Sequence, residues 1–194
     1  METTDAKKEA LGALSSSEYS VVLLDFDHTL FLDNSTDRYI DVLRPRLLAF
    51  LVVAASDWLV RALAWFGLCS YNNQRDFMRI AVCTLLMPWN LLRWRAVAEK
   101  LAKEEMNTPL LESLPKDKPV VVISHGFHHI IKPMLDTAGL SQAMLIASHV
   151  LPPFQNLRTE GKFRALERLA PGYDLTTALF ITDQYDDAAE APAQ

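Results

Sequence analysis

The chain has 194 residues, of which 50% are hydrophobic and 22% are charged, and its formal net charge is −5 at pH 7. This length allows one domain with an inserted subdomain, and the balance is that of a globular protein rather than a disordered one. The negative net charge argues against a general nucleic-acid binder, but it allows a locally positive site for a small anionic ligand.

The N-terminal residues 1–18 mix charged and apolar side chains without a continuous apolar stretch, so we expect a flexible tail and no signal peptide. The two cysteines, Cys69 and Cys83, lie in apolar surroundings. They are typical of reduced, buried thiols rather than of a disulfide framework. We therefore expect a cytoplasmic protein.

Four short apolar runs are expected to form a sheet, at residues 21–24, 120–123, 144–147 and 178–181. Continuous apolar runs without alternation are typical of strands that are covered on both faces, as in a parallel sheet. Helix-like segments at 127–137 and 162–169 separate the later runs. This order predicts an α/β fold with a doubly wound, Rossmann-like parallel sheet.

The interval between the first two runs is much longer than a crossover between strands requires. Residues 36–115 contain no convincing strand, but they hold apolar stretches of helical length and all four tryptophans. We therefore divide the chain into a tail (1–18), a discontinuous α/β core (19–35 and 116–194) and an inserted helical cap (36–115).

The inserted cap contains an unusually apolar stretch at residues 47–68. Its main interruptions are Ser56, Asp57 and Arg61. A narrow polar stripe on an apolar helix indicates deep burial, a partner or a membrane surface. The uninterrupted run 47–55 is far below the ~20 residues that span a bilayer. Packing within the cap is the favoured interpretation, and peripheral membrane contact of the cap is the alternative.

Asp25 and Asp27 directly follow the first run, in Asp25-Phe26-Asp27-His28-Thr29. Alternate side chains of an extended chain share a face, so both carboxylates can point into the crevice beyond the ends of parallel strands. Two carboxylates there can divide nucleophilic attack or cation binding from proton transfer. A turn or helix cap is the alternative for such an acidic strand end.

Polar residues near the later element boundaries suit the same site. Ser124 follows the second run, where its hydroxyl suits a phosphate oxygen or caps the next helix. Lys162 begins a helix, which is unfavourable for a cation unless an anion lies near; the alternative is a solvated lysine. Asp183 and Asp187 follow the last run, where they offer hard oxygen ligands for Mg²⁺ or form an acidic surface loop.

The order D-x-D-x-T, Ser, Lys and D-x-x-x-D, each at an element boundary, resembles the four motifs of the haloacid-dehalogenase-like superfamily. The resemblance covers residues 19–34 and 116–187. The segment 123–127 and the large helical insertion are most similar to the phosphoserine-phosphatase-like branch. The resemblance implies a Mg²⁺-dependent phosphatase that forms an aspartyl-phosphate and acts on a small phosphorylated metabolite.

The resemblance also implies a role for each motif residue. Asp25 would be the nucleophile, and Asp27 would protonate the leaving group and then activate water. The metal ligands would be Asp25, the backbone carbonyl of Asp27, Asp183 and Asp187. The phosphoryl group would be bound by Thr29, Ser124 and Lys162.

Three features depart from the superfamily pattern. His28 and Thr182 stand where glycine is usual, which narrows the expected site. Only seven residues follow Asp187, so we expect the last strand to be an open edge through which the chain can self-associate. Two alternatives to a phosphatase therefore stay open: a catalytically impaired module that binds phosphate or a membrane partner, and a phosphotransferase.

Two further sets of residues are candidates for binding. His125, His128 and His129 have a spacing that zinc sites use, but they lack a partner ligand in register, so we expect helix-surface or substrate-pocket histidines. His28 and His149 are expected to be separate from them. Arginines of the cap are expected to meet an anionic substrate or water: Arg44, Arg75, Arg79 and Arg93.

Overall fold

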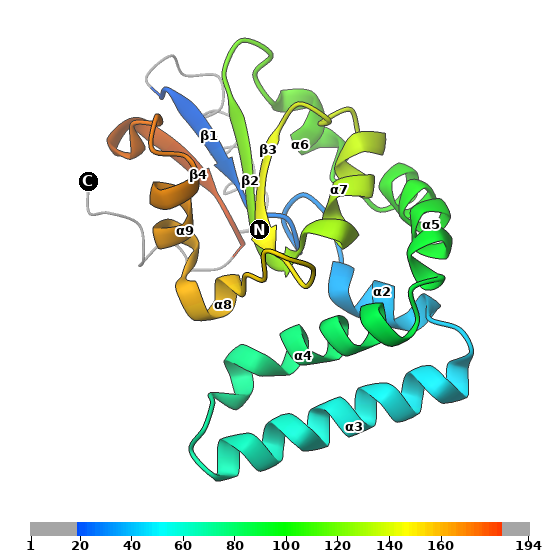
Figure 1. Cartoon of the computed structure of the whole chain (residues 1–194). Coiled ribbons are helices and arrows are strands. Elements are labelled where there is room, and N and C mark those ends of the chain that lie inside the picture. Colours follow the sequence, from blue (N-terminus) through cyan, green and yellow to red (C-terminus); the bar gives the residue numbers. More distant parts are fainter. Residues whose placement is uncertain (1–18, 184–194) are drawn as a thin grey trace, which may run out of the picture.

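The computed structural model describes residues 19–183, which form a sheet between helical layers and a helical hairpin that projects from one end (Figure 1). The expected N-terminal tail (1–18) and the metal-ligand candidate Asp187 lie outside the described residues.

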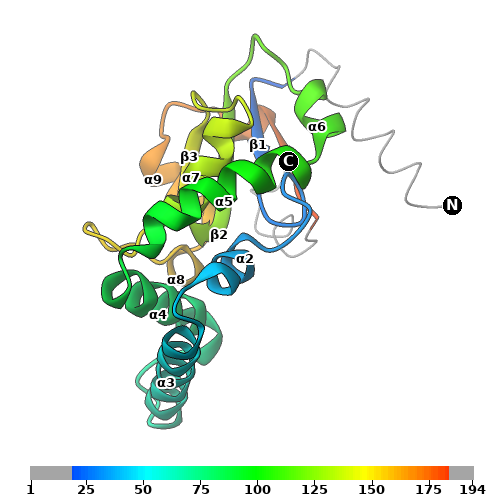
Figure 2. The ribbon, with the colours of Figure 1, turned by 90° about the vertical axis from the view of Figure 1, so that its right-hand side faces the viewer.

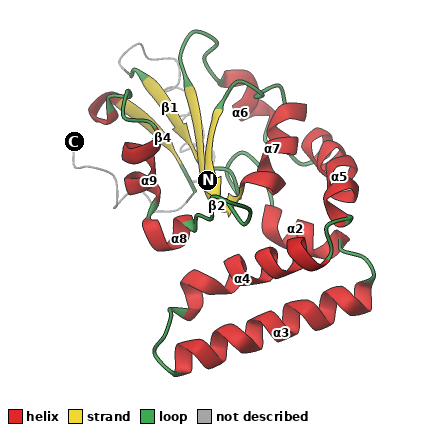
Figure 3. Ribbon diagram, viewed as in Figure 1, coloured by secondary structure: helices red, strands yellow, loops and turns green. Residues whose placement is uncertain are grey.

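The sheet consists of four parallel strands in the order β3-β2-β1-β4 (Figure 3). Their bounds are β1 (Val21–Leu24), β2 (Val120–Phe127), β3 (Met144–Ser148) and β4 (Ala178–Ile181). The predicted α/β fold and its four strands are therefore confirmed. Leu24 of β1 pairs with Val122 of β2 and with Ile181 of β4, so the residues after these strands meet at one edge of the sheet.

Both faces of the sheet are covered, because successive apolar residues of one strand point to opposite faces. Val22 and Leu24 belong to a large core with α7 (His128–Thr137). Val21 and Leu23 belong to a second core with α9 (Lys162–Leu169). Beside them lie the shorter elements α8 (Leu157–Glu160) and the 3-10 turn η1 (Leu175–Thr177).

The inserted segment divides into two parts. α2 (Ser35–Val42), α5 (Asn90–Glu104) and α6 (Thr108–Ser113) contribute buried side chains to the large core. Trp94 of α5 is fully buried, and its indole N–H donates to the carbonyl of Ile130 at 3.0 Å. These helices therefore share the large core with the sheet.

The remaining part of the insertion is a hairpin of α3 (Arg46–Trp65) and α4 (Tyr71–Leu86). The two helices pack side by side and stand away from the sheet, with α4 nearer to it (Figure 2). α4 ends two residues before Pro88, because proline disfavours helical backbone in the residue that precedes it. The chain then turns into α5. Both cysteines, Cys69 after α3 and Cys83 in α4, are free.

Candidate active site

Asp25 and Lys162 form a buried ion pair at the carboxyl edge of the sheet. The Nζ of Lys162 lies 2.9 Å from the Oδ2 of Asp25, and the two residues are 2% and 3% exposed. The other carboxylate oxygen, Oδ1, accepts the backbone N–H of Phe26 at 2.7 Å. A buried charge requires a partner of opposite sign. The alternative of a solvated Lys162 is therefore wrong.

Asp27 lies beside this pair and is held by the start of α2 and by β2. Its Oδ1 accepts the backbone N–H of Ser35 at 2.6 Å, and its Oδ2 accepts the hydroxyl of Ser124 at 3.3 Å. Burial raises the pKa of Asp27 above its ordinary value of 3.8, although these hydrogen bonds act in the opposite direction. A carboxyl group that keeps its proton to higher pH is suited to general acid catalysis.

Ser124 is part of β2 rather than the cap of a helix. Its hydroxyl oxygen accepts the backbone N–H of Gly126 at 3.0 Å, and α7 begins after Phe127 without a side-chain cap. The capping alternative for Ser124 is therefore wrong. A Cβ atom at Gly126 would lie only 3.1 Å from the Oδ2 of Asp27 and 2.8 Å from Ile131, so the close approach of β2 to Asp27 depends on this glycine.

Thr29 holds Asp183 in place. The hydroxyl of Thr29 donates to the Oδ1 of Asp183 at 3.2 Å and accepts the backbone N–H of Asp183 at 3.0 Å. The neighbouring Thr182 donates its hydroxyl to the Oδ2 of Asp25 at 3.4 Å. The structure thus ties the residues after β4 to the loop after β1, and it places the Thr29 hydroxyl on Asp183.

His28, at one of the glycine positions of the superfamily pattern, adopts a left-handed backbone conformation with a φ angle of 62°. Glycine occupies this region at little cost, whereas a residue with a Cβ atom is strained there. The side chain is exposed and lines the cavity described below. The histidine therefore adds an imidazole to the wall of the site.

The donor atoms around Asp25 fit a hard cation. Asp25 and Asp183 follow the adjacent strands β1 and β4, and the backbone carbonyl of Asp27 would supply a third oxygen to a bound cation. Among residues 19–183, no group of three or more His, Cys, Asp or Glu side chains is close enough to hold a metal ion. Mg²⁺ typically uses one or two carboxylates and keeps several waters, so this small set suits it better than zinc.

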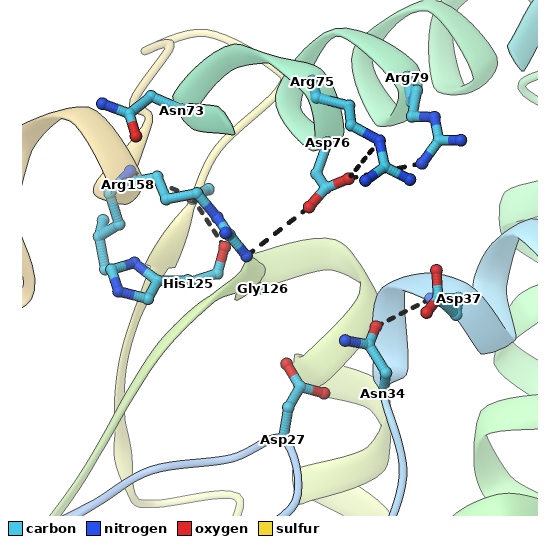
Figure 4. A network of polar contacts seen from close by, with 12 residues as sticks. Asp27, Asn34, Asp37, Asn73, Arg75, Asp76, Arg79, His125, Gly126 and Arg158 are labelled. Atoms are coloured by element: carbon cyan, nitrogen blue, oxygen red, sulfur yellow. Dashed lines mark hydrogen bonds and ion pairs between the residues drawn. The ribbon is translucent and has the colours of Figure 1, made fainter. Parts of the chain in front are cut away.

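A cavity of about 380 Å³ opens above Asp25, Asp27 and Ser124. Its far wall carries charged side chains of α4 and α8 (Figure 4). Arg158 of α8 lies 3.6 Å from the Oδ2 of Asp76 of α4, and Arg75 of α4 lines the same wall. The cavity thus has an acidic floor and a far wall with two guanidinium groups.

Only one of the four arginine candidates, Arg75, lines this cavity. Arg79 instead lies 3.6 Å from Asp76 and 4.0 Å from Asp57. Sequence reasoning missed Arg158, Asp76, Asn34 and Asp37, which also line the cavity. No motif marks them. Asp76 belongs to α4 and Arg158 to α8, whereas Asn34 and Asp37 lie at the start of α2.

The histidines are divided between different surroundings. His125 lines the cavity, whereas His129 is partly buried beside Thr84 at 3.3 Å, and desolvation lowers its pKa to about 4. His128 stacks on His149 with the ring centroids 4.6 Å apart. The expectation that His149 is separate from the cluster is therefore wrong.

Comparison with known proteins gives one family. The family model of the haloacid dehalogenase-like hydrolases matches residues 22–189 of the chain. No curated protein sequence matches this chain. Among solved structures, it is similar to the HAD-hydrolase YfnB from Bacillus subtilis bound to magnesium, with 16% identity over 84% of this chain and 79% of that one, at a TM-score of 0.46.

Proposed function

Because the chain belongs to the haloacid dehalogenase-like hydrolase family, we propose that it is a Mg²⁺-dependent phosphatase that acts on a small phosphorylated metabolite through an aspartyl-phosphate. The observation that carries this proposal is the arrangement of two neighbouring carboxylates in different surroundings. Asp25 is paired with the buried Lys162, whereas the pKa of Asp27 is raised by burial. Such a difference separates a nucleophile from a proton donor.

In the first proposed step, an oxygen of Asp25 attacks the phosphorus atom, and the bond from phosphorus to the leaving oxygen breaks. Asp27 gives its proton to that leaving oxygen. In the second step, Asp27 takes a proton from a water molecule that attacks the same phosphorus, so that phosphate leaves and Asp25 is restored. Asp27 thus acts as an acid and then as a base.

The charges around Asp25 favour this chemistry. A carboxylate and a phosphate dianion repel each other, and the ammonium of Lys162 reduces that repulsion at 2.9 Å from Asp25. Mg²⁺ held by Asp25, Asp183 and the Asp27 carbonyl would supply further positive charge when bound. Asp187 belongs to the proposed ligand set but lies outside the described residues.

Ser124 and Thr29 have different parts in this proposal. The Ser124 hydroxyl, which donates to Asp27, can turn to an oxygen of the bound phosphoryl group. The Thr29 hydroxyl is bonded to Asp183, so we assign it first to the orientation of that carboxylate. Its part in binding phosphate would be indirect.

The size of the cavity supports a small substrate. Its volume of about 380 Å³ lies near the lower end of the roughly 300–1,000 Å³ that is typical of small-molecule sites. Arg75 and Arg158 line the wall opposite the carboxylates. They are suited to a second anionic group of the substrate.

The direct test is the Mg²⁺-dependent release of phosphate from a generic aryl phosphate. We expect turnover by the full chain, its loss in Asp25→Asn, and unchanged turnover in Asp41→Asn, which alters an exposed carboxylate of α2. Asp27→Asn retains the Asp25–Lys162 pair and should slow release by about 10²–10⁴. Wild-type turnover in both site variants would exclude the mechanism.

Two other results would replace the proposal. Binding of a phosphate analogue without any turnover would indicate a catalytically impaired binding module. Transfer of the phosphoryl group to an added alcohol in preference to water would indicate a phosphotransferase.

A further inference from the structure

The helix α3 buries one narrow face and presents most of its large apolar side chains to solvent. Ser56 is only 4% exposed, and Asp57 accepts the hydroxyl of Tyr71 of α4 at 2.8 Å. On the opposite face, five large apolar side chains are between 54% and 82% exposed: Leu47, Phe50, Leu51, Trp58 and Trp65. A helix that packs on the core of a globular protein buries its large apolar side chains. The buried residues of α3 are instead small or medium-sized: Ala49, Val52, Ser56 and Val60.

The apolar surface continues beyond α3 at both ends of the hairpin. Phe66 and Leu68 extend it where α3 turns towards α4. At the other end, exposed residues at the end of α4 and the start of α5 extend it: Leu85, Leu86, Trp89 and Leu92. Monomeric soluble proteins rarely expose so many large apolar side chains on neighbouring helices, and such a surface indicates an interaction site.

The length and composition of α3 match a membrane environment. It has 20 residues, and 18 consecutive residues of it have a mean hydropathy of 1.9. Within residues 19–183 it is the one helix that is long and apolar enough to cross a membrane. Only 22% of this apolar stretch is buried inside the protein. Packing against α4 therefore leaves most of this helix uncovered.

An orientation in which α3 spans the bilayer is unfavourable for this hairpin. α3 packs along α4, which carries Arg75, Asp76 and Arg79 together with the wall of the active-site cavity. A bilayer-spanning α3 would draw these charges into the hydrocarbon, where each is costly. An orientation parallel to the membrane plane leaves α4 and the cavity in water.

A positive cluster lies at the end of the hairpin where α3 begins. Arg44 and Arg46 lie at the start of α3, and Arg93 lies in the first turn of α5, whose Asn90 accepts the backbone N–H of Arg44 at 2.9 Å. Partial desolvation, followed by the charges of Arg46 and Arg93, lowers the pKa of Arg44. Within the described part of the chain, no carboxylate forms an ion pair with any of them. The indole N–H of Trp89 donates to the carbonyl of Arg44 at 2.8 Å. Arginine beside tryptophan is typical of a membrane interface.

We propose that the exposed face of α3 binds the surface of an anionic phospholipid bilayer, with the helix in the membrane plane and Arg44, Arg46 and Arg93 at the headgroups. Anionic headgroups complement the positive cluster. A second copy of the chain on this face would bury the apolar side chains but leave the arginines without a counter-charge. The proposal is independent of the phosphatase activity.

Flotation of the full chain with lipid vesicles tests this proposal. Vesicles of phosphatidylcholine alone are compared with vesicles that also contain anionic phosphatidylglycerol. We expect the protein to float with the anionic vesicles. Arg46→Gln/Arg93→Gln should weaken that binding by roughly tenfold or more, because each arginine near an anionic surface contributes on the order of 1 kcal/mol.

The apolar contribution is tested with a matched pair of double variants. Phe50→Gln/Trp58→Gln removes two exposed side chains of α3 and should abolish flotation. Leu32→Gln/Phe154→Gln removes side chains that are 59% and 64% exposed on other parts of the molecule and should leave flotation unchanged. Circular dichroism checks that both variants keep the helical content of the wild type.

Three results would overturn the proposal. The first is wild-type protein that stays with the soluble fraction in the presence of anionic vesicles. The second is an equal loss of flotation in the control variant. The third is a stable dimer in the absence of lipid that Phe50→Gln/Trp58→Gln dissociates, together with no vesicle binding, since this would make a second copy the occupant of the α3 face.

Discussion

The ammonium group of Lys162 lies 2.9 Å from the carboxylate of Asp25, although 137 residues separate them in the chain. Both side chains are almost fully buried, so their attraction offsets part of the cost of removing two charges from water. The pair therefore contributes to the stability of the fold as well as to the proposed chemistry.

We expect that breaking this pair destabilises the protein. Asp25→Asn or Lys162→Met alone should lower the free energy of unfolding by about 3–5 kcal/mol, because one buried charge loses its counter-charge at 2.9 Å. The double variant Asp25→Asn/Lys162→Met should recover much of this loss. Urea unfolding measures all three, and a double variant as unstable as the sum of the single ones would contradict the coupling.

A second prediction concerns pH. The pKa of Asp27 is raised above 3.8 in the folded protein, mainly by burial. The folded state therefore binds this proton more tightly than the unfolded chain does. The resulting contribution to the free energy of unfolding is fully present below pH 3.8 and is lost as the pH rises through the folded pKa. Asp27→Asn removes this loss and retains an oxygen for the N–H of Ser35.

The Asp27→Asn variant should thus gain more stability over the wild type at neutral pH than at low pH. The difference amounts to about 1.4 kcal/mol for each unit by which the pKa is raised. Urea unfolding at both pH values measures it, with Asp41→Asn as the control. A gain that is equal at the two pH values would show that Asp27 does not carry a raised pKa.

The contact between Thr29 and Asp183 predicts how the two residues affect metal binding. Asp183→Ala should raise the dissociation constant of Mg²⁺, because a hard-cation site loses a carboxylate. Thr29→Val should raise it less, because the carboxylate remains but loses its hydrogen bonds. Calorimetric titration distinguishes these effects, with Asp136→Ala on α7 as a control. Wild-type affinity in Asp183→Ala would exclude this ligand.

The position of Arg158 in the cavity wall predicts a role in substrate binding. Arg158→Gln should raise the KM for a substrate with a second anionic group several-fold, whereas kcat should change little because the residue lies opposite the carboxylates. Arg164→Gln, an exposed arginine of α9, is the matched control. An equal KM in both variants would show that Arg158 does not bind the substrate.

The terminal position of β4 predicts self-association. Among the described residues, β4 pairs only with β1, so one side of this apolar strand has no strand partner there. Unpaired strand edges favour pairing with another chain. We expect sedimentation velocity to show larger species as the concentration rises. Slow hydrogen exchange at residues 178–181 in a strictly monomeric protein would contradict this.

The sequence by itself determined the sheet and the centre of the candidate site. The four apolar runs are short and have no polar alternation, which is typical of strands that are covered on both faces. Because the carboxyl ends of parallel strands meet at one edge, the residues after these runs are brought together without any knowledge of the packing. Asp25, Asp27 and Ser124 follow from this rule alone.

Only the tertiary structure decided the contacts that depend on how distant segments pack. Thr29 and Asp183 are joined by a hydrogen bond across 154 residues, and Arg158 faces Asp76 because α8 lies against α4. The apolar pattern of α3 was visible in the sequence, but the pattern does not say which face is covered. Periodicity records the differences among the faces of one helix, whereas burial depends on its neighbours. Beside α4, the buried residues of α3 include Val52, Ser56 and Val60, while its large apolar side chains stay exposed.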